Sequence, residues 1–170
     1  QELEEMLQNH FGTSFFMKSY PKSNLRNDFE KSKEIWLIGR DLGKITDEEW
    51  YFFEKYVQKD VKIKVLVVNP EDSAAIGYLK KASSKQEHDI LIQTEIKTTI
   101  AKWQGLIKNH ETRVELRVID QPIAFGAYAV DLNSDIGDGK IYLDLYVYRA
   151  KFDGRVKLVL SPSDTIWYDV

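Results

Sequence analysis

The sequence has 170 residues and a mass of 19.8 kDa, which suits one domain or at most two small ones. Its 43% hydrophobic and 30% charged residues exclude whole-chain disorder and fibrous repeats, and the absence of cysteine excludes disulfide scaffolds, thiol nucleophiles and cysteine zinc sites. The 24 basic and 27 acidic residues are intermixed, so the net charge of -3 gives no strong field for nucleic acid or an anionic membrane. No apolar run approaches the roughly 20 residues of a membrane span, and we expect a cytoplasmic protein.

The first half of the chain predicts a strand–helix–strand unit. An apolar run at 35–38 that ends at a glycine is typical of a central strand buried on both faces. Thr46 and Glu49 have the spacing of an N-terminal capping box for the helix that follows. A second apolar run at 65–68 stops at Asn69 and a proline. Connection rules make these two strands parallel neighbours or near neighbours.

The second half predicts two helices followed by strands. A helix at 73–82 precedes a longer one at about 87–108, which carries a single apolar stripe. Apolar alternation and short apolar runs then predict strands at 113–118, 124–130, 141–147 and 156–160. Ser161 and the proline after it predict the start of a last helix.

These elements predict one α/β domain with a mixed, mainly parallel sheet flanked by helices, in which the last strands form a more antiparallel group. We assign residues 1–24 to an N-terminal linker or helix and residues 25–170 to the domain. Because the first residue is Gln1 rather than methionine, we expect the chain to be a segment of a longer protein.

The sequence lacks the usual signatures of hydrolases, nucleotide hydrolysis and dinucleotide binding, and its three histidines lie in unrelated contexts. Residues from Asp131 to Asp135 begin like a calcium loop. The position that requires glycine is Ile136, however, and the position that requires the closing glutamate is Tyr142. A hairpin loop is therefore favoured over a metal site.

Arg40 and Asn69 are the residues that the pattern itself singles out for binding. Each follows a predicted buried strand, and open α/β sheets bind ligands at the carboxyl ends of their strands. An arginine there suits bidentate binding of a phosphate or carboxylate. The alternative is a solvated pair between Arg40 and Asp41.

Tyrosines at 128, 142, 146 and 148 suggest two interpretations. They could stack on bases or sugars, but aromatic residues at alternate strand positions more often form a covered face of a sheet. Because no basic residues are interleaved with them, nucleic acid is not expected as a partner.

The run at 35–39, the following helix and the strand at 61–70 resemble one half of the phospholipase D-like superfamily. That family carries the motif H-x-K-x-x-x-x-D, whose histidine attacks phosphorus and whose lysine holds the phosphate. If Asp131 matches the motif's aspartate, the histidine position is Ala124 and the lysine position is Gly126. Alanine is no nucleophile and glycine neutralises no phosphoryl group, so the family's catalysis does not carry over.

The resemblance implies an inactive, bacterial regulatory or sensor-type member of that superfamily. We expect a non-catalytic module that binds an anionic small molecule or a partner in the former active-site crevice through Arg40, Asn69 and Asp131, without cofactor or metal. One alternative is a homodimerising interaction domain that docks onto other domains of a larger signalling protein. Another is a metal-dependent phosphodiesterase that uses Asp131 and Asp135.

Overall fold

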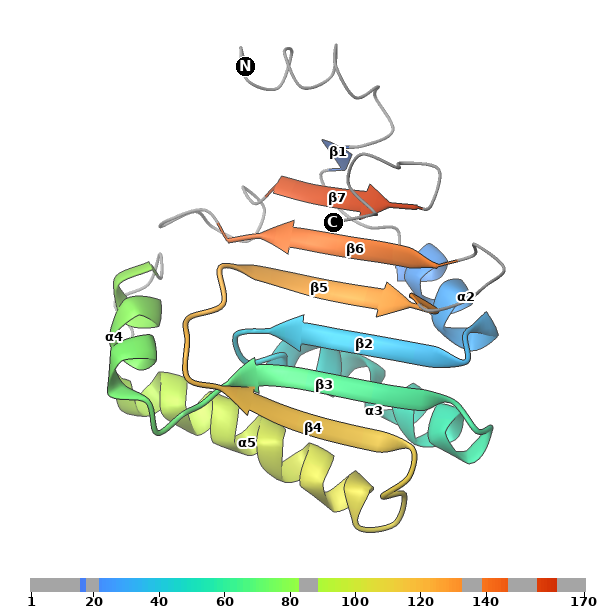
Figure 1. Cartoon of the computed structure of the whole chain (residues 1–170), viewed down its shortest axis with the longest axis horizontal. Coiled ribbons are helices and arrows are strands. Elements are labelled where there is room, and N and C mark those ends of the chain that lie inside the picture. The colour runs from blue at the N-terminus through green and yellow to red at the C-terminus, as the bar shows by residue number, and fades with distance from the viewer. Residues whose placement is uncertain (1–15, 18–21, 83–88, 133–138, 147–155, 162–170) are drawn as a thin grey trace.

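A seven-stranded mixed sheet forms the centre of the protein in a computed structural model, which describes residues 16–17, 22–82, 89–132, 139–146 and 156–161 (Figure 1). The strand order across the sheet is β1-β7-β6-β5-β2-β3-β4. The strands are β1 (Phe16–Met17), β2 (Glu34–Gly39), β3 (Lys62–Val68), β4 (Val114–Ile119), β5 (Phe125–Val130), β6 (Lys140–Leu145) and β7 (Val156–Leu160).

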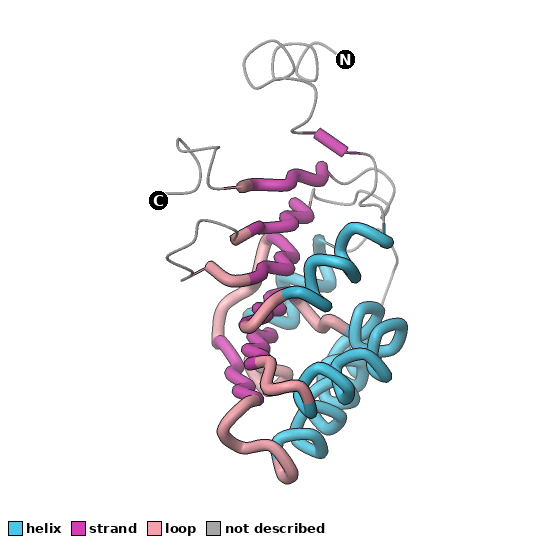
Figure 2. Tube along the Cα trace, turned by 90° about the vertical axis from the view of Figure 1, so that its right-hand side faces the viewer, coloured by secondary structure: helices cyan, strands magenta, loops and turns pink. Residues whose placement is uncertain are grey.

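The helices gather on one side of this sheet (Figure 2). They are α2 (Lys22–Lys31), α3 (Gly43–Gln58), α4 (Ser73–Ala82) and α5 (Asp89–Ile107). Two crossovers, one through α3 and one through α4 and α5, step in the same direction across the sheet from β2 to β3 to β4. Because such crossovers are right-handed, both place their helices on the same face. None of the described helices has the length and apolarity needed to cross a membrane.

Strand β2 joins the parallel and antiparallel parts of the sheet. It pairs in parallel with β3 and antiparallel with β5, which confirms the predicted strand–helix–strand unit. The α/β class, the mixed sheet and the antiparallel group at the end are also confirmed. Among the described strands only the β2–β3 and β3–β4 pairings are parallel, and the other four pairings are antiparallel. The sheet is therefore less parallel than its apolar runs suggest, because such runs do not encode strand direction.

The hydrophobic core lies between the sheet and the helices. Ile35 and Leu37 of β2 point into it, and the apolar stripe of α5 faces them from the helical layer. Trp103 of α5 is fully buried, with its ring centroid 5.2 Å from that of Phe53 and 5.4 Å from that of Trp50. Burying one large apolar side chain contributes about 1.5–3 kcal/mol, so this layer supplies most of the stability.

The predicted capping box does not form. Helix α3 begins at Gly43, so Thr46 lies inside its first turn and is buried. The Thr46 hydroxyl oxygen accepts a hydrogen bond from Trp103 Nε1 at 3.1 Å. Glu49 is also buried and accepts two bonds from Arg26 of α2, at 2.8 and 2.9 Å. The two residues thus tie α3 to its neighbouring helices instead of closing its N-terminus.

Two contacts connect the N-terminal part of the chain to the sheet. Asp28 of α2 accepts hydrogen bonds from Lys140 Nζ, at 3.0 and 3.1 Å, and from the Tyr142 hydroxyl of β6. Strand β1 pairs antiparallel with β7, with Phe16 opposite Leu158. Part of the segment that we assigned to a linker, residues 1–24, therefore belongs to the sheet. Residues 1–15 of that segment and the helix expected after Ser161 lie outside the described residues.

The contact between Thr46 and Trp103 leads to a stability prediction. We expect Thr46→Val to lower the free energy of unfolding by about 1–3 kcal/mol, because it leaves a buried indole N–H without an acceptor. Urea unfolding followed by circular dichroism measures the difference. The control is Thr98→Val on the exposed side of α5, which should change stability by less than about 0.5 kcal/mol. Equal losses in the two variants would contradict the prediction.

Candidate functional site

Arg40 and Asn69 lie beside each other, as their positions after parallel strands require. The backbone N–H of Val68 donates to the carbonyl oxygen of Arg40 at 3.3 Å. Arg40 Nε contacts Asp41 at 2.5 Å, which is the alternative that the sequence left open. The side-chain amide nitrogen of Asn69 donates a hydrogen bond to Asp120 at 2.7 Å. Its side-chain oxygen accepts one from the backbone N–H of Glu71 in the following turn. Both side chains are thus engaged in local loop contacts.

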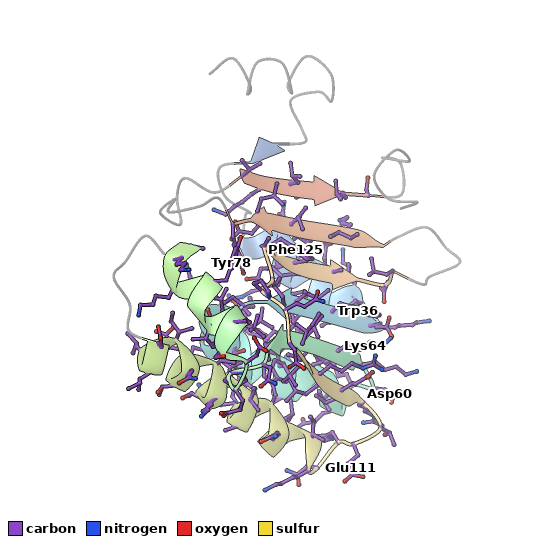
Figure 3. The ribbon with its side chains drawn as sticks, turned by 60° about the vertical axis from the view of Figure 1, so that its left-hand side comes forward. Trp36, Asp60, Lys64, Tyr78, Glu111 and Phe125 are labelled. Carbon is purple, nitrogen blue, oxygen red and sulfur yellow. The ribbon has the colours of Figure 1, made fainter. Side chains whose placement is uncertain are left out.

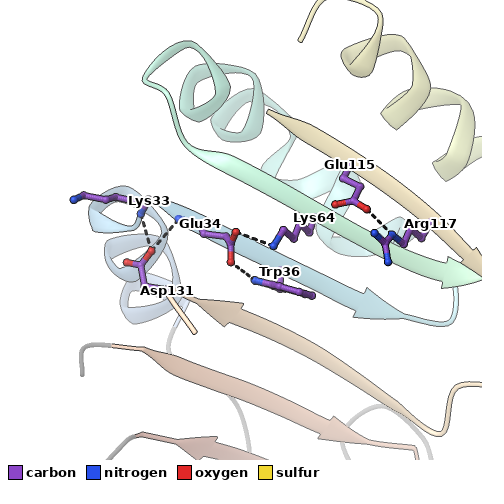
Figure 4. A network of polar contacts seen from close by, with 7 residues as sticks. All are labelled: Lys33, Glu34, Trp36, Lys64, Glu115, Arg117 and Asp131. Carbon is purple, nitrogen blue, oxygen red and sulfur yellow. Dashed lines mark hydrogen bonds and ion pairs between the residues drawn. The ribbon is translucent and has the colours of Figure 1, made fainter. Parts of the chain in front are cut away.

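Asp131 lies at the opposite end of the sheet. Its Oδ1 accepts hydrogen bonds from the backbone N–H groups of Lys33 and Glu34, each at 2.9 Å, at the start of β2 (Figure 4). Because β5 runs antiparallel to β2, the end of β5 meets the beginning of β2. A strand of six residues places its two ends about 17 Å apart. Asp131 therefore shares no crevice with Arg40 and Asn69.

A shallow cleft of about 320 Å³ lies between the start of α3 and the middle of α5. Its lining includes Asp41, Lys44, Asp47, Glu95 and Lys102, with threonines of α5 between them. None of the three predicted ligand-binding residues lines it. No cluster of three or more metal-ligating side chains occurs in the described part of the chain, and Asp135 lies outside that part.

The lysine position of the phospholipase D-like motif is filled by another side chain. A Cβ atom on Gly126 would lie 2.7 Å from the hydroxyl oxygen of Tyr146, and one on Gly39 would lie 3.2 Å from the same atom. The phenol thus occupies the space next to both glycines. Any side chain at position 126 would have to displace it.

The tyrosines of β5 and β6 belong to the covered face of the sheet. Tyr128 and Tyr142 are paired in the register, and Tyr142 is only 3% exposed. Burial raises the pKa of the Tyr142 phenol above its ordinary value of 10, and the hydrogen bond to Asp28 and the charge of Asp28 raise it further. Burial also raises the pKa of Tyr128. The interpretation of these rings as part of a covered face is confirmed, while Tyr148 lies outside the described residues.

The opposite face of the sheet carries charged side chains over β2, β3 and β4. Along these strands, residues such as Ile35 and Ile63 point toward the helices, and the residues between them project to the other side. We call this surface the outer face of β2–β4. Its charged and aromatic residues are Glu34, Trp36, Lys62, Lys64, Glu115 and Arg117, and the partly buried Ile38 and Leu66 lie on the same face.

Trp36 lies near the middle of β2 on the outer face of β2–β4 and is partly exposed. Lys64, its partner in the register, places Nζ 4.1 Å from the centroid of the indole ring. Glu34 contacts both residues: Oε1 accepts from Trp36 Nε1 at 2.6 Å, and Oε2 lies 2.9 Å from Lys64 Nζ. Figure 3 shows Trp36 and Lys64 pointing away from the helical layer.

Two further cations flank this group. Lys62 is exposed and lies opposite Glu34 in the register of β2 and β3. Arg117 has a side chain that is 75% exposed and forms an ion pair with Glu115 on the same strand. The outer face of β2–β4 thus combines a partly exposed tryptophan with three cations, and both of its carboxylates are held in ion pairs.

The sequence interpretation missed this surface because the run at 35–38 suggests a strand buried on both faces. A tryptophan within such a run is indistinguishable from a core residue when the sheet has helices on both sides. The alternation of lysine and isoleucine from Lys62 to Lys64 is the signal for a solvent-facing side.

No known protein-family model matches this chain, and no curated protein matches it. Among solved structures it is similar to that of TrmBL2, described as an archaeal chromatin protein with a novel mode of DNA binding. The sequence identity is 16% and the TM-score is 0.49, and the alignment covers 97% of this chain and 54% of TrmBL2. The chain therefore spans about half the length of that protein.

The positions of the predicted site residues correct the functional expectations. Arg40 and Asn69 lie at the opposite end of the strands from Asp131, so the expected crevice for an anionic small molecule does not form. A bacterial phospholipase D-like sensor that binds its ligand through these three residues is therefore the wrong expectation. We also withdraw the two alternatives, a homodimerising interaction domain and a metal-dependent phosphodiesterase. The expectation that excluded nucleic acid as a partner is withdrawn as well. The solved structure that was found is that of a protein described as a DNA-binding chromatin protein, not as a phospholipase D-like sensor. The resemblance to the phospholipase D-like scaffold itself stays a prediction.

The position of Asp131 predicts a structural role. We expect Asp131→Ala to lower the free energy of unfolding by about 1–3 kcal/mol, because two backbone N–H groups lose their acceptor. Asp131→Asn keeps an acceptor oxygen and tolerates the positive φ of 49° at this residue, so it should retain most of the stability. Urea unfolding of both variants tests this, and an alanine variant as stable as the parent would disprove it.

The raised pKa of Tyr142 predicts a loss of stability in alkali. The folded protein holds the phenol proton more tightly than the unfolded chain, so the stabilisation is lost as the pH rises above the ordinary tyrosine pKa of 10. Denaturant unfolding between neutral and strongly alkaline pH should show a smaller decline in Tyr142→Phe than in the parent. Parallel declines would show that this phenol is not responsible.

Proposed function

We propose that this chain is a nucleic-acid-binding module and that the outer face of β2–β4 is its contact surface. The observation that carries the proposal is a partly exposed tryptophan on the same sheet face as three cations, opposite the face that the described helices cover. Trp36 offers an aromatic ring with Lys64 directly against it, and Lys62 and Arg117 place further positive charge on the same face. Sheet surfaces of this kind bind nucleic acids by stacking bases on aromatic rings while cations contact the phosphates.

The charge arrangement supports a local contact rather than long-range attraction. The net charge of -3 does not draw a polyanion toward the molecule as a whole. On the outer face of β2–β4, however, Glu34 and Glu115 are neutralised by ion pairs that are partly or largely exposed. Exposed pairs contribute only about 0–1 kcal/mol, so a phosphate group can replace either carboxylate at low cost.

The proposal rests on this surface and not on the similarity to TrmBL2, because a likeness at 16% identity does not transfer a function. A phospholipase D-like origin of the scaffold, which we retain as a proposal, is compatible with it, since the positions of the family's reactive groups are alanine and glycine here. The cysteine-free composition fits a reducing compartment, and we propose the cytoplasm as the place of action.

Binding of a fluorescent oligonucleotide of about 20 nucleotides, followed by anisotropy at low salt, tests the proposed function. We expect Lys62→Glu and Arg117→Glu each to lower the affinity by about fivefold or more, because each reverses a phosphate-contacting charge. The affinity of the parent should fall as the salt concentration rises, since binding releases counterions.

The matched control is Lys55→Glu, which makes the same charge reversal on the exposed side of α3 in the helical layer. It should bind like the parent. Absence of binding by the parent, or equal losses in all three variants, would reject the outer face of β2–β4 as a nucleic-acid site.

A further inference from the structure

The carboxylate of Glu34 holds two neighbours through its two oxygens (Figure 4). Oε1 accepts the indole N–H of Trp36 at 2.6 Å, and Oε2 lies 2.9 Å from Lys64 Nζ. The same lysine nitrogen stands 4.1 Å from the centroid of the Trp36 ring. One face of the ring is therefore covered by an ammonium group that Glu34 keeps in place.

We infer that this group selects single-stranded nucleic acid, and that Glu34 acts as a latch that keeps the stacking face of Trp36 covered until a phosphate arrives. The inference rests on the proposed function and adds the class of ligand and the order of events. It follows from one geometric fact. The Lys64 ammonium group, which would bind a phosphate, is the same group that covers one face of the Trp36 ring.

The exchange replaces the ion pair between Lys64 and Glu34 by one between Lys64 and the phosphate, and Glu34 keeps only its hydrogen bond from Trp36. When a backbone phosphate approaches, Lys64 moves from the Glu34 carboxylate to the phosphate, and its ammonium group leaves the ring. Glu34 keeps the hydrogen bond from Trp36 Nε1 through its other oxygen, so the indole stays in position while its face opens. An unpaired base attached to that phosphate then stacks on the ring, whereas the bases of a duplex present no free face.

The neighbours of Trp36 across the sheet are one mobile cation-bearing side chain and one small residue. In the register, Trp36 lies between Lys64 on β3 and Ala129 on β5. Beyond Lys64 the same row continues to Glu115, whose carboxylate pairs with Arg117 and not with Lys64. Once Lys64 moves, no other charged residue that directly pairs with Trp36 in the register covers the ring.

The chain offers a matched pair of variants, Glu34→Gln and Glu115→Gln. Each removes one negative charge from the same face, so any general electrostatic gain is equal in both. Only Glu34→Gln releases Lys64, and the glutamine oxygen still accepts the indole N–H. We expect it to raise the affinity for a single strand about threefold to tenfold above that of Glu115→Gln, as expected when one exposed ion pair is removed.

The strand preference is measured with single-stranded and duplex DNA of the same length and sequence. The parent should bind the single strand about fivefold or more tightly than the duplex, in line with the stacking of one base on an aromatic ring. Trp36→Leu should abolish this preference while it leaves duplex binding within about twofold. Thermal unfolding of each variant verifies that it is folded.

A second readout follows the latch without measuring affinity. The indole N–H resonance of Trp36, assigned by its loss in Trp36→Phe, should stay near its position in Glu34→Gln, because the hydrogen bond is retained. The ring protons of Trp36 should shift in that variant, because the cation leaves, and shift again when a single strand is added. They should not move in Glu115→Gln.

The two proposals fail in different ways. If the parent binds no nucleic acid, the proposed function fails and the latch fails with it. If binding depends on Lys62 and Arg117 but single strand and duplex bind equally, only the latch and its strand selectivity are rejected. A lower affinity in Glu34→Gln than in Glu115→Gln would also reject the latch, because Glu34 would then be a positioning residue for Lys64.

Discussion

The arrangement of this molecule depends on the antiparallel pairing of β5 with β2. The pairing is closed at one end by Asp131, whose backbone N–H donates to the carbonyl oxygen of Glu34 at 3.0 Å. Its carboxylate in turn accepts the N–H groups of Lys33 and Glu34. Three backbone groups at the start of a central strand are thereby satisfied by one residue, and leaving such groups unsatisfied would be costly.

This pairing also decides what can form a site. Parallel addition of β5 would have brought Asp131 to the same edge as Arg40 and Asn69, where α/β proteins commonly bind ligands. The antiparallel direction sends it to the other edge and leaves the first two residues in local loop contacts. The antiparallel register also pairs Trp36 with Ala129, so the residue next to the indole on β5 has a small side chain.

The contacts on the two faces of the sheet contribute different amounts to stability. On the helical side, fully buried residues such as Phe53 and Trp103 each contribute on the order of kilocalories per mole through apolar burial. On the outer face of β2–β4 the contacts are partly exposed ion pairs and one cation–π contact, each worth about 1 kcal/mol or less. Contacts this weak exchange readily with a ligand, and losing them leaves the core unchanged. Stability and the proposed recognition are therefore separable in this fold.

By itself the sequence determined the α/β class, the strand–helix–strand unit and the positions of most helices and strands, though not that of β1, because hydrophobic periodicity and turn residues act over a few neighbouring positions. It also placed Arg40 and Asn69 side by side, since both follow parallel strands. Only the tertiary structure decided the direction of β5, the burial of Thr46 inside α3 and the exposure of Trp36. These depend on which segments pack together from distant parts of the chain, and an apolar strand has the same pattern whether one or both of its faces are covered.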